Sequence, residues 1–224
     1  MMKRLSYIML TALMVSSASV SAGVVMSGTR IVYPQNSKEV AFSVSNMESA
    51  TPYLIQSWVE GDGKTGNNAA PFIVTPPLFR LDPDQTNTLR IQYTGAPLPT
   101  DRESVFWLDI KAIAPKPKES SNELQVNVKS KFKIFYRPEN LKGDAATAWQ
   151  KVRFSTTQKG LEATNPTPYY VSFYRLSVSG HKIEQPGMIG PGETREWPVA
   201  ASGSVTWSAI NDFGAITATR SQPL

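Results

Sequence analysis

The sequence predicts an all-β protein with two β-sandwich domains, and three observations support this prediction. Apolar and polar residues alternate in many short segments, which is the period expected of strands with one buried side. Clusters of Pro, Gly, Asn and Asp separate these segments, as in sandwiches built from short strands. The alternation stops over residues 139–148 and then resumes, which indicates a second domain. No segment has the period of an amphipathic helix longer than a few turns.

Residues 1–22 are predicted to be a secretory signal peptide that is not part of the fold. A basic start is followed by an apolar run at residues 5–15 and by small residues that end in Val-Ser-Ala. This layout is typical of a signal peptide cleaved after Ala22. The apolar run is too short for an ordinary membrane span, so we expect no membrane insertion after its removal; a retained anchor is the alternative. The remaining chain is long enough for two domains of about 100 residues each.

The composition argues against nucleic-acid binding and against several kinds of site. The net charge is +5, but Lys and Arg are scattered and do not cluster with aromatic residues as in nucleic-acid-binding surfaces. The mild basic bias favours an acidic partner without identifying one. The chain has no cysteine, so an exported protein of this sequence depends on hydrophobic cores instead of disulfides. Cysteine nucleophiles and thiolate metal ligands are excluded for the same reason.

The first domain is expected to span residues 23–143. The clearest alternation of apolar and polar residues occurs at residues 40–44, 53–59, 89–93 and 106–110. Turn-forming residues lie between these segments, at residues 33–36, 61–68, 75–77, 81–84 and 95–101. Together with the flanking segments this pattern predicts about seven strands, which is an immunoglobulin-like number.

The second domain is expected to span residues 144–224 as a smaller immunoglobulin-like β-sandwich. Residues 139–148 are mostly polar and small, and we interpret them as a linker. Strand patterns follow at residues 152–154, 169–176, 181–183, 195–199, 205–210 and 215–219.

The segment at residues 122–138 is the most informative strand of the chain. Its apolar residues alternate with polar ones and form a row: Leu124, Val126 and Val128. Lys131 and Lys133 follow, and an apolar row that ends in fixed cations is suited to hold another extended chain by its carboxyl end. The alternative is that the row faces the core of its own domain. Lys129 and Lys131 are interpreted as solvated side chains.

A series of short motifs runs along the chain in a fixed order. The strand just described ends in Lys-Ile-Phe-Tyr-Arg-Pro at residues 133–138. Thr-Arg-Ile-Val-Tyr lies at residues 29–33, and Ile-Asn-Asp-Phe-Gly at residues 210–214. Further motifs lie at residues 52–58, 75–77, 80–83, 101–107 and 165–170. In order and spacing these motifs resemble the PapD-like family of periplasmic pilus chaperones, and the short loop at residues 113–122 resembles its subgroup that assembles rigid or thick pili.

This resemblance implies two immunoglobulin-like β-sandwich domains in a boomerang arrangement, with a cleft between them. The family carries two cations in the cleft that grip the C-terminal carboxylate of a bound subunit, and by position these are Arg30 and Lys133. The row Leu124, Val126 and Val128 corresponds to the strand that the family donates to the subunit. The alternative for Lys133, and also for Arg30, is that the charge protects a strand edge against aggregation.

Three further charged residues correspond to an ion network between the two domains of this family: Glu103, Arg137 and Asp212. Such a network would fix the angle between the domains and, with it, the shape of the cleft. The alternative is that these are three unrelated surface charges.

The function implied by the resemblance is that of a periplasmic chaperone, not of an enzyme. Such a chaperone binds fimbrial or pilin subunits, supplies the strand that each subunit lacks, and delivers them to an outer-membrane usher. No nucleotide or other cofactor is expected. The main alternative is a secreted structural or adhesive β-sandwich protein that keeps its strand buried. An exported hydrolase is a third interpretation, but no nucleophile and base form a visible pair.

Three motifs suggest chemistry but have simpler interpretations. Residues 61–66 match G-x-G-x-x-G, yet no helix is expected after them to hold a phosphate. His181 is the only histidine and cannot build a histidine-rich metal site. Asp82 and Asp84 flank a proline in a turn, without the further spaced acids that calcium requires. We therefore expect no metal site.

Overall fold

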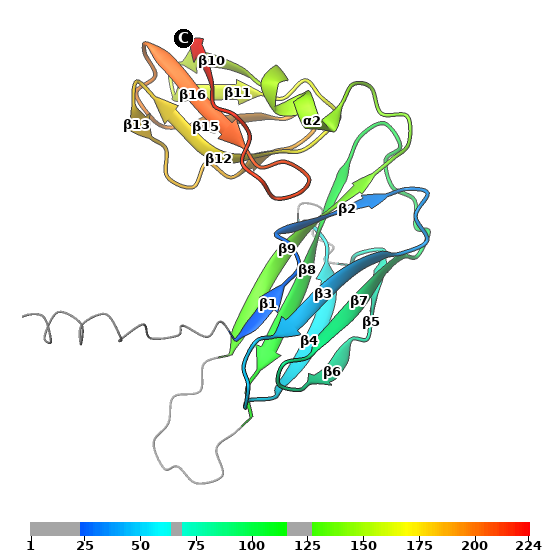
Figure 1. Ribbon diagram of the computed structural model, residues 1–224. Coiled ribbons are helices and arrows are strands. Elements are labelled where there is room, and N and C mark those ends of the chain that lie inside the picture. The colour runs from blue at the N-terminus through cyan, green and yellow to red at the C-terminus, as the bar shows by residue number, and fades with distance from the viewer. Residues whose placement is uncertain (1–22, 64–68, 116–126) are drawn as a thin grey trace, which may run out of the picture.

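The protein consists of two β-sandwich domains, and the second lies at an angle across one end of the first (Figure 1). The computed structural model describes residues 23–63, 69–115 and 127–224. Regular structure in these residues is almost entirely strand, so the predicted all-β fold with two sandwiches is confirmed. No helix within the described ranges has the length and apolar character needed to cross a membrane. The predicted signal peptide lies outside the described residues.

The first domain contains two sheets. One sheet has the spatial order β1 (Val24–Met26), β3 (Val40–Asn46), β7 (Thr86–Tyr93) and β5 (Phe72–Thr75). The other has the order β2 (Arg30–Pro34), β9 (Val128–Arg137), β8 (Ser104–Ile113), β4 (Tyr53–Glu60) and β6 (Leu78–Leu81). The described part of this domain thus has nine strands where the sequence predicted about seven. The count differs because β1 and β2 pair in different sheets and because β5 and β6 are too short to show alternation.

The core of the first domain lies between the two sheets and follows the predicted alternation. On β8, Leu108 and Ile110 are fully buried on the inward side, whereas Trp107 and Asp109 belong to the outward side. β8 and β9 pair antiparallel, and β9 pairs in parallel with β2 on its other edge. Most apolar residues of this five-stranded sheet thus face the core, and its charged residues lie on the outward side.

The second domain is a smaller sandwich with its own core. Its three-stranded sheet has the order β10 (Arg153–Thr157), β11 (Gly160–Thr164) and β15 (Thr194–Trp197). Its larger sheet contains β13 (His181–Lys182), β12 (Val171–Val178), β16 (Ser204–Ala209) and β17 (Arg220–Pro223), with β14 (Met188–Ile189) paired to β12. Trp207 lies at the centre of the core, and its indole N–H donates to the Trp149 carbonyl at 3.0 Å.

Two sequence interpretations in this region were wrong. The segment interpreted as a linker contains α2 (Ala145–Ala148), followed by a 3-10 turn at Trp149–Lys151. The Asp144 carboxylate caps this helix by accepting the Ala146 N–H at 2.9 Å, and Trp149 is buried in the core. The strand predicted at residues 215–219 is reduced to one bridge between Ile210 and Ile216, and the last strand, β17, begins later.

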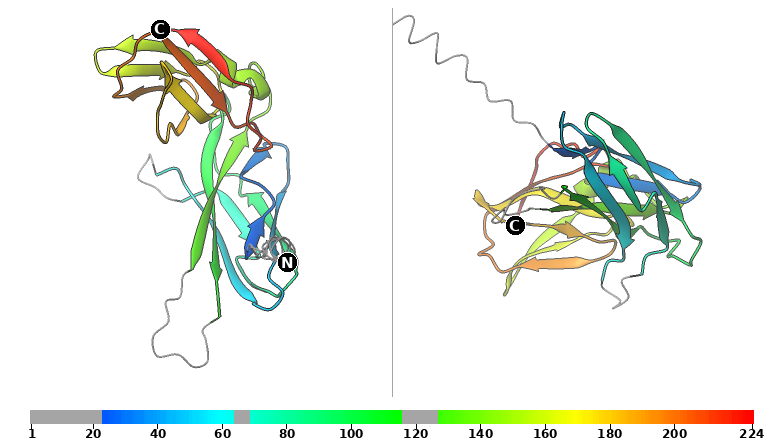
Figure 2. Two further views of the ribbon diagram at one scale, coloured as in Figure 1. Left: turned by 60° about the vertical axis from the view of Figure 1, so that its left-hand side comes forward. Right: turned by 90° about the horizontal axis from the view of Figure 1, so that it is seen from below.

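The connection between the domains follows directly from β9. Figure 2 (left) shows β8 and β9 as long paired strands that run along the first domain up to the second. β9 ends at Arg137, and the chain enters the second domain through the loop before α2. The end of β9 next to the second domain is therefore part of the boundary between the two domains.

Candidate functional site

One edge of β9 is only partly covered. Residues 133–137 of β9 pair with β2, in a register that places Arg30 opposite Lys133. Residues 128–132 pair with β8 on one side, and no described strand pairs with their other edge. Unpaired N–H and C=O groups on a strand edge can accept another strand. The free edge therefore ends where β2 begins.

The side chains next to this edge change from exposed to buried along β9. Val128 is 59% exposed, Phe132 is partly buried against Phe42, and Ile134 is fully buried. All three lie on the same side of the strand because they are separated by even numbers of residues. The alternative that the whole predicted row faces its own core is thus wrong for Val128. Leu124 and Val126, the other predicted members of the row, lie outside the described residues.

Arg30 and Lys133 lie side by side at the end of the free edge that is nearer the second domain. Neither forms an ion pair with a described residue, although one Arg30 Nη1–H donates to the Ile210 carbonyl at 2.9 Å. The Arg30 Nε–H is buried without a described hydrogen-bond partner. Burial lowers the pKa of Arg30, and the nearby Asp212 carboxylate partly offsets this effect. The pKa of Lys133 is lowered by burial and then by the charge of Arg30.

The charges of Arg30 and Lys133 favour the binding of an anion between them. Two partly buried cations repel each other, and each has lost part of its hydration. A carboxylate placed between them would relieve the repulsion and form charge-assisted hydrogen bonds. The pair is therefore chemically suited to bind a carboxylate, in a position that continues the free edge of β9.

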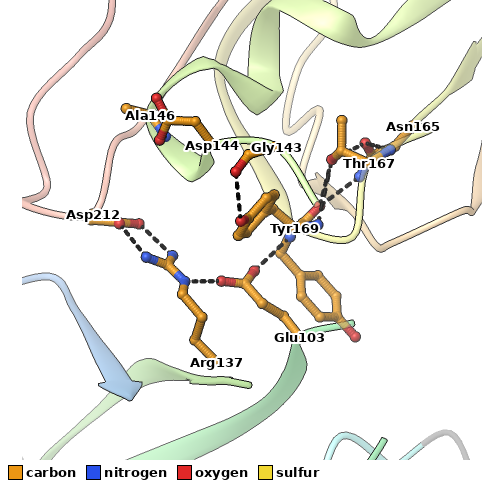
Figure 3. Close-up of polar contacts among 10 residues, drawn as sticks. Glu103, Arg137, Gly143, Asp144, Ala146, Asn165, Thr167, Tyr169 and Asp212 are labelled. Atoms are coloured by element: carbon orange, nitrogen blue, oxygen red, sulfur yellow. Dashed lines mark hydrogen bonds and ion pairs between the residues drawn. The ribbon is translucent and has the colours of Figure 1, made fainter. Parts of the chain in front are cut away.

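The three residues predicted to form an interdomain network are brought together at the domain boundary (Figure 3). Arg137 at the end of β9 donates through Nε to the Glu103 carboxylate at 2.6 Å. Its two terminal nitrogens donate to both oxygens of Asp212, at 2.7 and 3.0 Å. Glu103 is buried, and its second oxygen accepts the Tyr170 N–H at 2.7 Å. One guanidinium thus connects a carboxylate of each domain.

Charge and burial oppose each other in this network. Burial raises the pKa of Glu103, while the positive charge of Arg137 lowers it in part. Burial also acts to lower the pKa of Arg137, but its hydrogen bond to Asp212 and the charge of Glu103 raise it above its usual value. The pairing more than offsets the desolvation of Arg137 but offsets that of Glu103 only in part.

Sequence reasoning missed a second charged cluster on the outward side of the same sheet. Lys129 Nζ lies 2.9 Å from Oδ1 of Asp109, whose side chain is 0% exposed. Lys131 Nζ lies 2.8 Å from Glu60 Oε2 and 3.7 Å from Asp109 Oδ2. The interpretation of Lys129 and Lys131 as merely solvated is therefore wrong. The missing information was the strand order, which places Glu60, Asp109 and Lys131 on the adjacent strands β4, β8 and β9.

The cluster holds Glu60 in its ionised form. The Trp58 indole N–H donates to Glu60 Oε1 at 2.9 Å, opposite the oxygen that accepts from Lys131. The hydrogen bond from Lys131 lowers the pKa of Glu60 to about 2, with the Trp58 hydrogen bond as the next cause. The same hydrogen bond raises the pKa of Lys131. Both charges are thus stabilised within the cluster.

The motifs that suggested other chemistry lie away from this region or lack the necessary partners. His181 is exposed on the two-residue strand β13. Asp82 accepts a hydrogen bond from Arg80 at 2.6 Å, and Asp84 has the positive φ of a turn residue. The described half of the glycine motif, up to Gly63, precedes no described helix. Within the described ranges no group of three metal-ligating side chains was found.

Two sandwiches with a free strand edge and a cation pair near their boundary are features of a chaperone that receives an extended polypeptide segment. Two family models match the chain. The N-terminal domain of PapD, described as a pili and flagellar-assembly chaperone, matches residues 23–142, and the PapD C-terminal domain, described as a pili assembly chaperone, matches residues 147–221. The chain belongs to the PapD family of pilus-assembly chaperones, a class that is not enzymatic.

Individual relatives agree with this assignment over almost the whole chain. The probable fimbrial chaperone LpfB of Escherichia coli O157:H7 is 39% identical over 221 residues, which cover 96% of this chain and 94% of that protein. The chaperone protein FimC of Escherichia coli K12 is 41% identical over 217 residues, covering 94% and 88%. A chain from the structure of the Salmonella enterica SafA pilin in complex with the SafB chaperone has a TM-score of 0.83 at 32% identity, covering 92% and 99%.

Proposed function

We propose that this protein binds fimbrial subunits in the periplasm and supplies them with a strand along the free edge of β9. The observation that carries the proposal is the geometry of that edge. It is open over residues 128–132 and ends where Arg30 and Lys133 stand side by side. A subunit strand added to this edge, parallel to β2, would end with its C-terminal carboxylate at the two cations.

Strand addition gives affinity that depends little on the subunit sequence. Main-chain hydrogen bonds along the edge supply the general part of the interaction. Val128, together with Leu124 and Val126 from the predicted row, would supply apolar contacts in the groove of a subunit that lacks a strand. Burial of three such side chains contributes roughly 1.5–3 kcal/mol each, before the cost of ordering the complex.

The cation pair would fix the position of the subunit along the edge. A chain has only one C-terminal carboxylate, so its capture decides which subunit residue lies next to each residue of β9. Arg30 offers a planar fork of donors and Lys133 a single charged group. Both are partly desolvated, which strengthens their interaction with an anion.

Delivery of the subunit to an outer-membrane usher completes the proposed role. The relatives are named as fimbrial chaperones, and one structural relative was solved with a pilin. The predicted signal peptide supports location in the periplasm. Release would occur by exchange of the chaperone strand for a better-fitting strand of the next subunit. This mechanism needs no nucleotide.

The proposal is tested by periplasmic co-expression with candidate fimbrial subunits and measurement of the complex. We expect the wild type to form a one-to-one complex. Lys133→Ala is expected to weaken it by at least about tenfold, because a hydrogen bond between charged groups is lost. The readouts are co-purification and an affinity measured with the isolated subunit.

A matched control separates the loss of a specific cation from the loss of charge alone. Lys111 lies on the outward side of β8, and Lys111→Ala removes one positive charge from the same sheet. We expect this variant to bind as the wild type does. Equal weakening by both substitutions, in folded proteins, would remove Lys133 from the proposed site. A wild type that binds no subunit would contradict the proposed function itself.

A further inference from the structure

Three lysines lie at two-residue intervals on the outward side of β9: Lys129, Lys131 and Lys133. A strand repeats its side-chain direction every two residues. A bound strand that slips by two residues therefore keeps every side chain on the correct side. Apolar alternation alone cannot prevent such a slip, and each of the three ammonium groups is a possible partner for the C-terminal carboxylate.

Slippage toward the second domain is blocked by the chain itself. β2 pairs with β9 from Lys133 onward, and its first residue, Arg30, lies directly opposite Lys133. A subunit strand that occupies the free edge would run in line with β2 and meet its beginning. It cannot advance past this point without displacing β2. The only register shifts left open are those away from the second domain, toward Lys131 and Lys129.

The two lysines in that direction are already neutralised. Lys129 is paired with the fully buried Asp109 at 2.9 Å, and Lys131 with Glu60 at 2.8 Å. Each lysine also lies near the carboxylate of the other pair: Lys131 is 3.7 Å from Asp109, and Lys129 is 3.9 Å from Glu60. A carboxylate arriving at either lysine would have to replace one of these oxygens and remain close to the negative charge of both.

Lys133 differs from the other two in its charged neighbours. Its ammonium lies 5.7 Å from the centre of the Trp107 ring, much as that of Lys131 does at 5.8 Å, but no described carboxylate forms an ion pair with Lys133. Arg30 adds a second positive charge beside it. Among the three lysines, the one at the end of the edge is therefore the one whose charge is available to a new anion.

We propose that Asp109 and Glu60 determine the register of the bound subunit strand by pairing with Lys129 and Lys131, respectively. The subunit carboxylate is then left with Lys133 and Arg30 as its favourable site. β2 limits the strand in one direction, and the two acids disfavour shifts in the other. Asp109 and Glu60 act as positioning residues and do not contact the carboxylate. This inference rests on the proposed function, because it concerns the strand that the subunit contributes.

Disulfide cross-linking measures the register directly. The chain contains no cysteine, so Ser130→Cys introduces a unique thiol beside the free edge. The probe is a fimbrial subunit that co-purifies with the protein, freed of its own cysteines. Single cysteines are placed one at a time along its last strand. We expect the wild-type background to give one dominant cross-linked position.

Removal of the two negative charges is expected to permit a second register. In the Asp109→Asn/Glu60→Gln background, we expect an additional cross-link two residues nearer the C-terminus of the subunit. Its share should rise at least about tenfold over the wild-type background, which corresponds to about 1.4 kcal/mol. Asp82→Asn, which removes an exposed acid paired with Arg80, should leave the pattern unchanged. If the double variant does not fold, Glu60→Gln alone gives the same test.

The outcomes separate this inference from the proposed function. One and the same cross-linked position in wild type and in the acid variants would overturn the inference but leave strand addition in place. No cross-link at any position in the wild type would overturn both. A second register that appears equally in Asp82→Asn would also overturn the inference, because the effect would then not depend on Asp109 and Glu60.

Discussion

Lys133 differs from the two lysines before it on β9 in what surrounds its ammonium group. Lys129 and Lys131 are paired with carboxylates, whereas Lys133 has no described carboxylate partner and lies beside Arg30. Burial and the neighbouring cation both disfavour its charged form. In the proposed role, the positive charge of Lys133 is thus unfavourable in the free protein, and a bound carboxylate would stabilise it.

The protonation of Lys133 is therefore expected to respond to binding. In the free protein its pKa should lie below the usual 10.5, and capture of a carboxylate should raise it. The complex then takes up protons when it forms at alkaline pH, and its affinity falls as pH rises through the lowered pKa of the free protein. The measurement is an NMR titration of the Lys133 side chain, with and without bound subunit.

Arg30→Gln is the matched variant for this titration. It removes the neighbouring positive charge but leaves the burial of the lysine in place, so the pKa of Lys133 should rise part of the way. A pKa of Lys133 that is already at its usual value in the free protein would contradict the expectation. So would a pKa that does not change when the subunit binds.

At the level of strands, the cluster on β4, β8 and β9 connects the middle of the sheet to the strand with the free edge. Asp109 lies on β8, Glu60 on β4, and their lysine partners on β9. Pairs across adjacent strands stabilise a sheet, and here they link β9 to two strands at once. This helps β9 to stay extended where β2 no longer covers its edge.

The contribution of Glu60 to stability should depend on pH in a defined range. Its pKa is lowered from 4.5 to about 2 in the folded protein. A lowered carboxyl pKa gives stability that is fully present above the unfolded value and is lost as pH falls through the folded value. We expect Glu60→Gln to be less stable than the wild type at pH 6, and the difference to shrink steadily between about pH 4.5 and pH 2. Urea denaturation at several pH values measures it.

A constant difference between the two proteins over this pH range would contradict the expectation, because it would show that the carboxylate charge is not responsible. Asp82→Asn serves as a control. Asp82 also pairs with a cation, but in an exposed position on the surface, where ion pairs contribute little.

Alternation along the chain predicted many of the strands and, on strands such as β3 and β8, which side faces the core. It could not predict which strands lie next to each other, since pairing joins segments that are far apart in sequence. The contact of Lys131 with Glu60 depends on β8 lying between β4 and β9, so it was missed. The adjacency of Arg30 and Lys133 was expected only from the family resemblance. α2 was missed because a single turn of helix shows no period.

At the level of the whole molecule, the boundary between the domains and the candidate site share residues and neighbours. Arg30 donates to the Ile210 carbonyl of the second domain, and Arg137 pairs with Asp212 two residues further on. Phe135, which lies between Lys133 and Arg137 on β9, packs on Tyr170 of the second domain with ring centres 5.6 Å apart. A change in the domain angle would therefore alter the contact that holds the Arg30 side chain beside Lys133.

Removal of the central guanidinium tests whether the network holds this angle. Arg137→Ala leaves Glu103 buried with the Tyr170 N–H as its remaining described donor, and it frees Asp212. We expect a loss of about 3–5 kcal/mol in the free energy of unfolding, as for other broken buried ion pairs. The radius of gyration from small-angle scattering should increase because the domains are no longer joined by this group.

Arg80→Ala is the control. It breaks an ion pair in which the arginine side chain is 69% exposed, and it should lower the free energy of unfolding by at most about 1 kcal/mol. Unchanged scattering and unchanged stability of Arg137→Ala would show that the domain angle is held by other contacts, such as Phe135 against Tyr170.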